Sequence, residues 1–105
     1  MAIEIERRFL VTNEDWECEV IQSEGYHQAY LNSKADEWAT RVRVIDNEKA
    51  YLTLKSSLNG LTNYEFEYSI PLQDAIKLIE LSKYKITKTR YQLIINKKNW
   101  VVDLF

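Results

Sequence analysis

Residues 41–55 read Arg-Val-Arg-Val-Ile-Asp-Asn-Glu-Lys-Ala-Tyr-Leu-Thr-Leu-Lys, and this stretch decides the fold. Apolar and polar side chains alternate on both sides of an Asp-Asn-Glu turn, which is the pattern of two paired β-strands. We therefore predict a hairpin between residues 38–46 and 49–56. Side chains two positions apart on a strand point the same way, so Arg41 and Arg43 share a face. Like charges at that spacing repel each other unless a counter-ion lies between them.

The same alternation recurs along the chain, and the charges are sorted by sign from strand to strand. Acidic pairs are Glu4 with Glu6 and Glu65 with Glu67, and the basic positions are Arg41, Arg43, Lys55, Lys88 and Arg90. Solvent-exposed strands usually mix the two signs, because opposite charges pair favourably across strands. Sorted charges favour a sheet that curls with its charged face inward, where acidic and basic walls could hold a metal-bound polyphosphate. An ordinary charged outer face is the alternative.

Further elements follow from periodicity and from the turn residues. We expect strands over residues 2–11, 26–33, 62–70, 86–95 and 100–105, and one helix over about 71–83. Pro71 suits the first turn of that helix, and the apolar residues after it recur at helical spacing. The chain is therefore predicted to be one mainly β (α+β) domain, residues 1–105, built from antiparallel strands and one main helix.

Composition excludes several classes of protein. The 105 residues carry a net charge of −2, so no overall positive field directs the chain to nucleic acid. No apolar run is long enough to span a bilayer, and the first residues lack the apolar core of a signal peptide. The single cysteine, Cys18, cannot form an internal disulfide. We therefore expect a cytoplasmic protein that binds neither nucleic acid nor membrane.

Several short motifs together resemble a known family. The segment Glu4-Ile5-Glu6-Arg7-Arg8-Phe9-Leu10-Val11 is similar to the N-terminal ExExK signature of the CYTH superfamily, the triphosphate tunnel metalloenzymes. The resemblance continues in order through Gln28-Ala29-Tyr30-Leu31, Arg41-Val42-Arg43, Leu52-Thr53-Leu54-Lys55, Glu65-Phe66-Glu67, Lys88-Thr89-Arg90-Tyr91 and Val102-Asp103-Leu104-Phe105. It covers essentially the whole chain, and it implies an antiparallel β-barrel that forms a tunnel for triphosphate and a divalent metal.

The resemblance also implies roles for individual residues. Glu4, Glu6 and Asp103 would bind Mg²⁺ or Mn²⁺, Arg41, Arg43, Lys55, Lys88 and Arg90 would hold phosphates, and Glu65 and Glu67 would organise basic groups or water. Tyr30 matches a tyrosine that assists proton transfer or positioning in some members; aromatic packing at the barrel mouth is the alternative. Arg8 replaces the signature lysine, and it stays charged near neutral pH, which makes it a poor proton shuttle.

Family members continue past the strand that holds Asp103 into another strand with a Glu-x-Glu pair, so we expect a barrel incomplete at its C-terminal end. The resemblance implies metal-dependent hydrolysis of triphosphate substrates, either inorganic triphosphate or an organic triphosphate such as thiamine triphosphate. Two alternatives remain open. One is a cyclase that forms cyclic AMP from ATP with the same walls. The other is a non-catalytic module that binds polyphosphate anions and completes its barrel as a homodimer.

Overall fold

A computed structural model describes residues 2–32 and 38–105, which form one antiparallel sheet, one α-helix and one 3₁₀ helix. The strands are β1 (Ile3–Ile5), β2 (Val20–Tyr30), β3 (Ala39–Ile45), β4 (Lys49–Ser57), β5 (Thr62–Ser69), β6 (Tyr84–Ile95) and β7 (Lys98–Leu104), and the helices are η1 (Asp15–Glu19) and α1 (Leu72–Leu81). The strand order β1-β5-β4-β3-β2-β6-β7 makes β1 and β7 the edges. The predicted mainly β fold with one main helix is confirmed.

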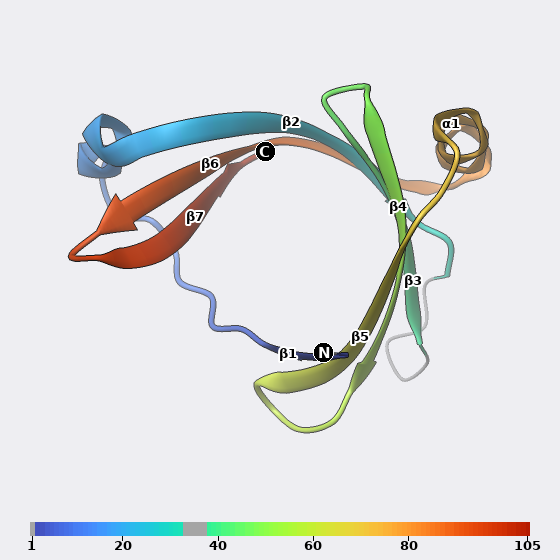
Figure 1. Cartoon of the computed structure of the whole chain (residues 1–105), viewed down its shortest axis with the longest axis horizontal. Helices are drawn as coiled ribbons and strands as arrows, with labels where there is room; N and C mark the ends of the chain where they lie inside the picture. The colour runs from blue at the N-terminus through green and yellow to red at the C-terminus, as the bar shows by residue number, and fades with distance from the viewer. Residues whose placement is uncertain (1, 33–37) are drawn as a thin grey trace.

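The sheet curls like half of a barrel, and α1 packs on its convex side (Figure 1). The core between them contains Ala29, Val42, Val44 and Ala50 from the sheet and Ala75 and Ile79 from α1. Burying an aliphatic side chain such as Ile79 contributes about 1.5–3 kcal/mol to stability. Because side chains alternate across a strand, Arg41 and Arg43, which flank Val42, point to the concave face. The inward orientation of the charged face is therefore confirmed.

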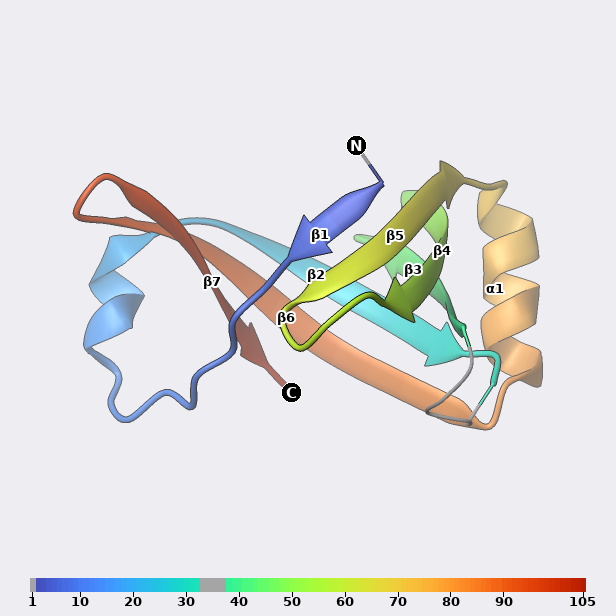
Figure 2. The same ribbon diagram turned by 90° about the horizontal axis from the view of Figure 1, so that it is seen from below.

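The chain between β1 and η1 crosses the open side of the curled sheet from one edge toward the other (Figures 1 and 2). At the far edge, the ring of Phe9 lies against Trp100 of β7, with centroids 6.3 Å apart. A tilted aromatic pair at this distance contributes about 0.5–1.5 kcal/mol beyond the area it buries. The N-terminal segment therefore contacts both edges of the sheet.

The first strand is much shorter than expected, because it includes only Ile3–Ile5 of the predicted residues 2–11. β1 pairs with β5 alone, and Ile5 lies opposite Thr62, the first residue of β5. One further backbone hydrogen bond joins Glu6 N to the Leu61 carbonyl at 3.2 Å, and the pairing ends there because the chain before Leu61 turns through Asn59 and Gly60. Alternation beyond that point reflects an extended segment outside the sheet, and Leu10 is 95% exposed.

The second strand is longer than expected, because β2 begins at Val20 instead of residue 26. Its first half pairs with β6, and the register slips between Val20 and Gln22. Such a bulge interrupts strict alternation, so the first half of β2 does not show the period-two pattern of a strand. Residue 33, the last of the predicted strand 26–33, lies outside the described part of the chain.

The two hairpins that flank the charged strands have tight turns. Asp46 and Asn47, between β3 and β4, have φ of 53° each, and Asn96 and Lys97, between β6 and β7, have φ of 52° and 64°. Left-handed backbone at consecutive positions matches the right-handed twist of the strands, and Asn and Asp tolerate it better than most residues. The turns therefore set the register of the charged strands. Neither described helix is long and apolar enough to cross a membrane.

Candidate anion-binding site on the concave face

Five cationic side chains are brought to the concave face by strand register. Arg41 and Arg43 come from β3, Lys55 comes from β4, and Lys88 and Arg90 come from β6. Pairing places Thr53 and Tyr51 opposite the two β3 arginines, so Lys55 follows on the same face. The arginine and lysine nearest the middle are almost covered: Arg43 is 9% exposed and Lys88 is 8% exposed. The concave face therefore contains cations that water reaches poorly.

The acidic wall surrounds Lys55. Its Nζ lies 2.8 Å from Glu4 Oε2, 3.7 Å from Glu6 Oε2 and 4.0 Å from Glu65 Oε2. The Glu4 oxygen is buried, and the ion pair lacks the angles of a hydrogen bond. One ammonium thus lies among three carboxylates, which come from β1, from the residue just after it and from β5.

A second group of contacts links β3, β4 and β5. Arg41 Nη2 donates a hydrogen bond to Thr53 Oγ1 at 3.2 Å, and Thr53 Oγ1 in turn donates to Glu67 Oε2 at 3.2 Å. Arg41 and Glu67 also form an ion pair at 3.9 Å. Arg41 Nε is buried without a hydrogen-bond partner among the described residues. This unused N–H leaves Arg41 able to donate a hydrogen bond to one more oxygen.

On β6 and β7, Asp103 joins two cations. Arg90 donates two hydrogen bonds to its carboxylate, at 2.8 and 2.9 Å, and Lys88 Nζ donates another at 2.6 Å. Burial alone would raise the pKa of Asp103, but these hydrogen bonds outweigh it and lower that pKa to about 2. The hydrogen bond to Asp103 raises the pKa of Arg90, whereas burial lowers the pKa of Lys88. Both oxygens of Asp103 are thus engaged by cations.

Arg43 has only uncharged partners among the residues that the structure describes. Its Nε donates a 2.7 Å hydrogen bond to Gln28 Oε1, and its Cζ lies 4.5 Å from the ring centroid of Tyr26. Burial, followed by the charges of Arg41 and Arg90, lowers the pKa of Arg43 to about 10. It remains protonated at neutral pH, so an incompletely compensated positive charge lies at the middle of the concave face.

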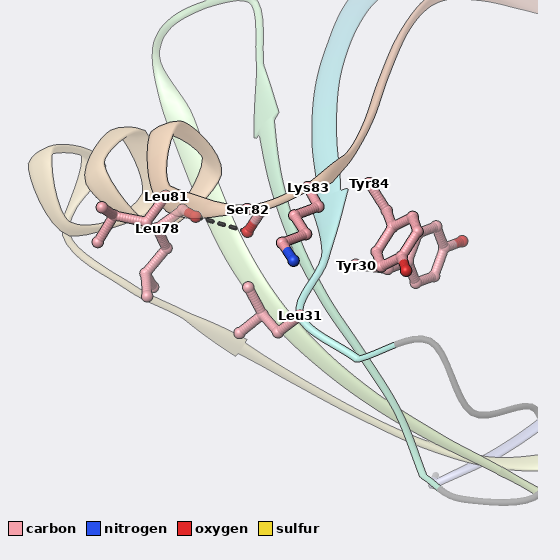
Figure 3. Close-up of a pocket in the computed structure, with 7 residues that line it drawn as sticks. All are labelled: Tyr30, Leu31, Leu78, Leu81, Ser82, Lys83 and Tyr84. Carbon is pink, nitrogen blue, oxygen red and sulfur yellow. Dashed lines mark hydrogen bonds between the residues drawn. The ribbon is translucent and has the colours of Figure 1, made fainter.

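The two residues expected to take part in catalysis lie at the margin of this cluster. Tyr30 is directly opposite Arg41 in the pairing of β2 with β3. Arg8 follows β1, its side chain is 82% exposed, and Nε donates to Glu6 Oε1 at 2.6 Å. That hydrogen bond raises the pKa of Arg8. Tyr30, the last residue of β2, lines a pocket of about 320 Å³ beside Tyr84 and the C-terminal end of α1 (Figure 3). In the same pocket, Ser82 Oγ donates to the carbonyl of Leu78 at 2.7 Å.

The donor chemistry of the acidic wall fits a hard divalent cation, because Mg²⁺ and Mn²⁺ prefer carboxylate oxygens. Its geometry is only partly suited to one. The carboxylates of Glu4, Glu6 and Glu65 lie 2.8, 3.7 and 4.0 Å from Lys55 Nζ, so a metal ion bound among them would have to displace this ammonium. Within residues 2–32 and 38–105, no group of three or more His, Cys, Asp or Glu side chains is arranged to hold a metal. Asp103, on the opposite edge of the sheet, is not grouped with Glu4 and Glu6.

Three residues that organise the site were not predicted from the sequence, namely Tyr26, Gln28 and Thr53. Gln28 and Thr53 are each 2% exposed, and Tyr26 is 6% exposed. Each of them is a polar or amphipathic residue on the same face of the sheet as the charged positions. This shared face can be recognised only when the register of β2, β3 and β4 is known. They are the uncharged partners of the cations.

The described chain is a curled antiparallel sheet with an apolar core on its convex side and cationic side chains on its concave face. The chain belongs to the CYTH domain family, whose model matches residues 2–104. It is 35% identical over 107 aligned positions to an inorganic triphosphatase of Acetivibrio thermocellus, and the match includes all of this chain and 67% of that protein.

A solved structure has a similar fold. A conserved hypothetical protein from Pyrococcus furiosus superposes with a TM-score of 0.61 at 25% sequence identity. The match covers 81% of this chain and 56% of that protein, so the chain spans little more than half the length of this relative. The comparison supports the expected incomplete barrel of the CYTH type.

Proposed function

We propose that the chain is a single triphosphate-binding domain that hydrolyses triphosphate compounds with a divalent metal ion, using the concave face as its substrate site. The observation that carries this proposal is the convergence of five cations on that face, of which Arg43 and Lys88 are nearly buried. Buried charges are costly unless they are paired, so such a cluster fits a ligand with several negative charges. The similarity to an inorganic triphosphatase makes inorganic tripolyphosphate the first substrate to test.

In this proposal the cations bind the triphosphate from two sides of the curled sheet. Arg41 and Lys55 would bind from β3 and β4, and Lys88 and Arg90 would bind from β6. Arg43 lies between them on β3. Guanidinium groups bind phosphate oxygens through paired hydrogen bonds, and lysine contributes a point charge. Phosphoryl transfer needs mainly positioning and charge stabilisation from the protein, which a rigid sheet supplies well.

The carboxylates would have two roles. Glu65 and Glu67 would keep Lys55 and Arg41 oriented, in keeping with the contacts described above. Glu4 and Glu6 would hold the metal, with Asp103 contributing from the other edge. When bound, Mg²⁺ or Mn²⁺ would neutralise phosphate charge and make a water molecule more acidic.

Arg8 and Tyr30 are proposed to act at the ends of the site. Arg8 is exposed and remains charged, so its part would be to bind an outer phosphate and not to transfer a proton. Tyr30 lies where β2 ends, and its hydroxyl would position the leaving phosphate or assist proton transfer. A Tyr30→Phe variant separates these roles from ring packing, because it retains the ring.

The deciding experiment measures phosphate released from tripolyphosphate with Mg²⁺ or Mn²⁺. It compares the wild-type chain with a Glu4→Gln/Glu6→Gln double variant, and Glu80→Gln on the exposed face of α1 serves as the control. We expect hydrolysis by the wild type and the control, and a loss of at least about 100-fold in the double variant, in the range for removing charge-stabilising groups. Equal rates in all three would contradict the proposal.

A second candidate is binding without hydrolysis, and the incomplete metal shell of the described residues favours it. In that case the edges β1 and β7 would pair with a second copy, and a homodimer would complete the barrel. Calorimetry that shows tripolyphosphate binding without any phosphate release would support the module. A monomer in sedimentation at micromolar concentration would count against its dimer.

A further inference from the structure

Tyr26 lies beneath three of the five cations. Arg43 Cζ is 4.5 Å from its ring centroid, Arg90 Cζ is 4.9 Å away, and Lys88 Nζ is 5.7 Å away. The ring is 6% exposed, so water contributes little to these contacts. A cation within about 6 Å of an aromatic centroid is attracted by the negative face of the ring, and the attraction grows when water is excluded.

Strand register explains why one ring reaches all three cations. Tyr26 lies on β2 between β3 and β6, directly opposite Lys88 on one side and Ile45 on the other. Arg90 is opposite Glu24, and Arg43 is opposite Gln28, so both are diagonal neighbours of Tyr26 on the same face. Diagonal pairs remain within reach of aromatic and long side chains.

The three cations differ in how their charge is balanced. Lys88 and Arg90 share the carboxylate of Asp103, whereas Arg43 has the Gln28 amide and the ring. Arg43 forms no salt bridge within residues 2–32 and 38–105. The ring face and the Gln28 amide oxygen together therefore supply the negative potential that holds Arg43 beside two other positive groups.

We propose that Tyr26 is a positioning residue whose ring holds Arg43, Lys88 and Arg90 as one preorganised anion-binding unit. This inference rests on the proposed function, because the anion bound by the unit would be the triphosphate. A preorganised unit binds more tightly, since its side chains lose little freedom when the ligand arrives. The ring, and not the hydroxyl, carries this role.

Two substitutions separate ring from hydroxyl. Tyr26→Phe retains the ring. Tyr26→Leu removes the ring but keeps an apolar side chain at this position. Tyr68→Leu is the matched control, because Tyr68 lies on β5 at the other face of the sheet and is 56% exposed. In calorimetry with metal-free tripolyphosphate, the Kd of Tyr26→Phe and the Kd of the control should lie within about twofold of the wild-type Kd. Tyr26→Leu should bind about tenfold more weakly, as expected from losing a desolvated cation–ring contact.

A spectroscopic readout tests the ring contacts without any ligand. A group above an aromatic face is shifted upfield by the ring current, so the guanidinium resonances of Arg43 and Arg90 should be shifted in wild type and Tyr26→Phe. The shifts should disappear in Tyr26→Leu and persist in Tyr68→Leu. If Tyr26→Leu does not fold, unshifted resonances in the wild-type chain would still overturn the proposal.

The calorimetry separates failure of the role proposed for Tyr26 from failure of the proposed function. Wild-type affinity in a folded Tyr26→Leu variant would overturn the role of Tyr26 alone. Equal weakening in Tyr26→Phe and Tyr26→Leu would assign the effect to the hydroxyl and overturn the ring platform. A wild-type chain that binds no tripolyphosphate would overturn both proposals, whatever the resonances show.

Discussion

Asp103 receives both ends of the Arg90 guanidinium, with Nε 2.8 Å from Oδ1 and Nη2 2.9 Å from Oδ2. Lys88 Nζ approaches Oδ2 from β6 as well, at 2.6 Å. A carboxylate bound in this way stands where an oxyanion of a ligand could bind the same cations. Asp103 therefore compensates part of the positive charge of Lys88 and Arg90 on the β6 side of the site.

This ion pair predicts how stability depends on pH. The pKa of Asp103 is lowered to about 2 in the folded chain, whereas an unfolded aspartate titrates near pH ~3.9. The unfolded state therefore binds more protons between these values, and the stabilisation is complete only above about pH 5 and is lost as the pH falls toward ~2. Urea unfolding should show a steeper loss of stability across this range in wild type than in Asp103→Asn. Glu48→Gln, in an exposed turn, should behave as wild type, and parallel slopes for all three would refute the prediction.

Gln28 should matter for stability although it carries no charge. Its amide oxygen accepts the hydrogen bond from Arg43 Nε, and the residue is 2% exposed. Gln28→Leu would leave a buried guanidinium donor unpaired, which costs about 1–3 kcal/mol in the free energy of unfolding. Gln22→Leu, an exposed position of β2, is the control and should change stability by less than about 0.5 kcal/mol. Guanidinium chloride unfolding measures both, and a Gln28→Leu variant as stable as the control would show that this contact is dispensable.

Lys55 should compete with a divalent metal for the acidic wall. Its ammonium lies among Glu4, Glu6 and Glu65, at 2.8, 3.7 and 4.0 Å. Lys55→Met removes that charge, so Mn²⁺ should raise the melting temperature of this variant more than that of wild type, by mass action on the folded state. Lys49→Met, at the exposed start of β4, should respond like wild type. The competition would be disproved by the same Mn²⁺ response in every variant.

Helix α1 should stabilise the curled sheet through Ile79. This side chain is 2% exposed and belongs to the core cluster, whereas Ile76 on the same helix is 51% exposed. Ile79→Ala should lower the free energy of unfolding by about 2–4 kcal/mol, because it removes packed atoms and leaves a cavity. Ile76→Ala should cost less than about 1 kcal/mol. Urea denaturation followed by far-UV circular dichroism measures the difference, and equal losses would argue against a core at this place.

The sequence predicted the architecture because alternation and turn chemistry are local signals. The β3–β4 hairpin was found from residues 41–55, and the structure pairs Arg41 with Thr53 as that pattern requires. Failures occurred where structure depends on distant partners. β1 ends where β5 begins, and β2 extends back to Val20 because it pairs with the long strand β6. Neither partner can be seen in the local pattern.

The residues of the site, like the strands of the sheet, were predicted from the sequence, but their contacts were not. Clusters of like charge identified the cations and carboxylates, and the structure places them on one concave face. Which charges pair with which was not readable from spacing: Asp103 joins Lys88 and Arg90, while Glu4 joins Lys55. Uncharged partners such as Tyr26 were also missed, because an aromatic in a strand ordinarily indicates core packing.

The strand order has a consequence for the speed of folding. β3, β4 and β5 pair with their neighbours in sequence, whereas β2 must pair with β6, which brings Val20 opposite Leu93. Such a distant pairing is slowed by the entropy of closing a long loop, so we expect the hairpins to form earlier. Arg41 and Arg43 lie on the early part, and Lys88 and Arg90 on the strand that docks late. The ability to bind an anion between these two parts should therefore appear only in the last step of folding. An anion that bridges them would slow the separation of β6 from β2 during unfolding.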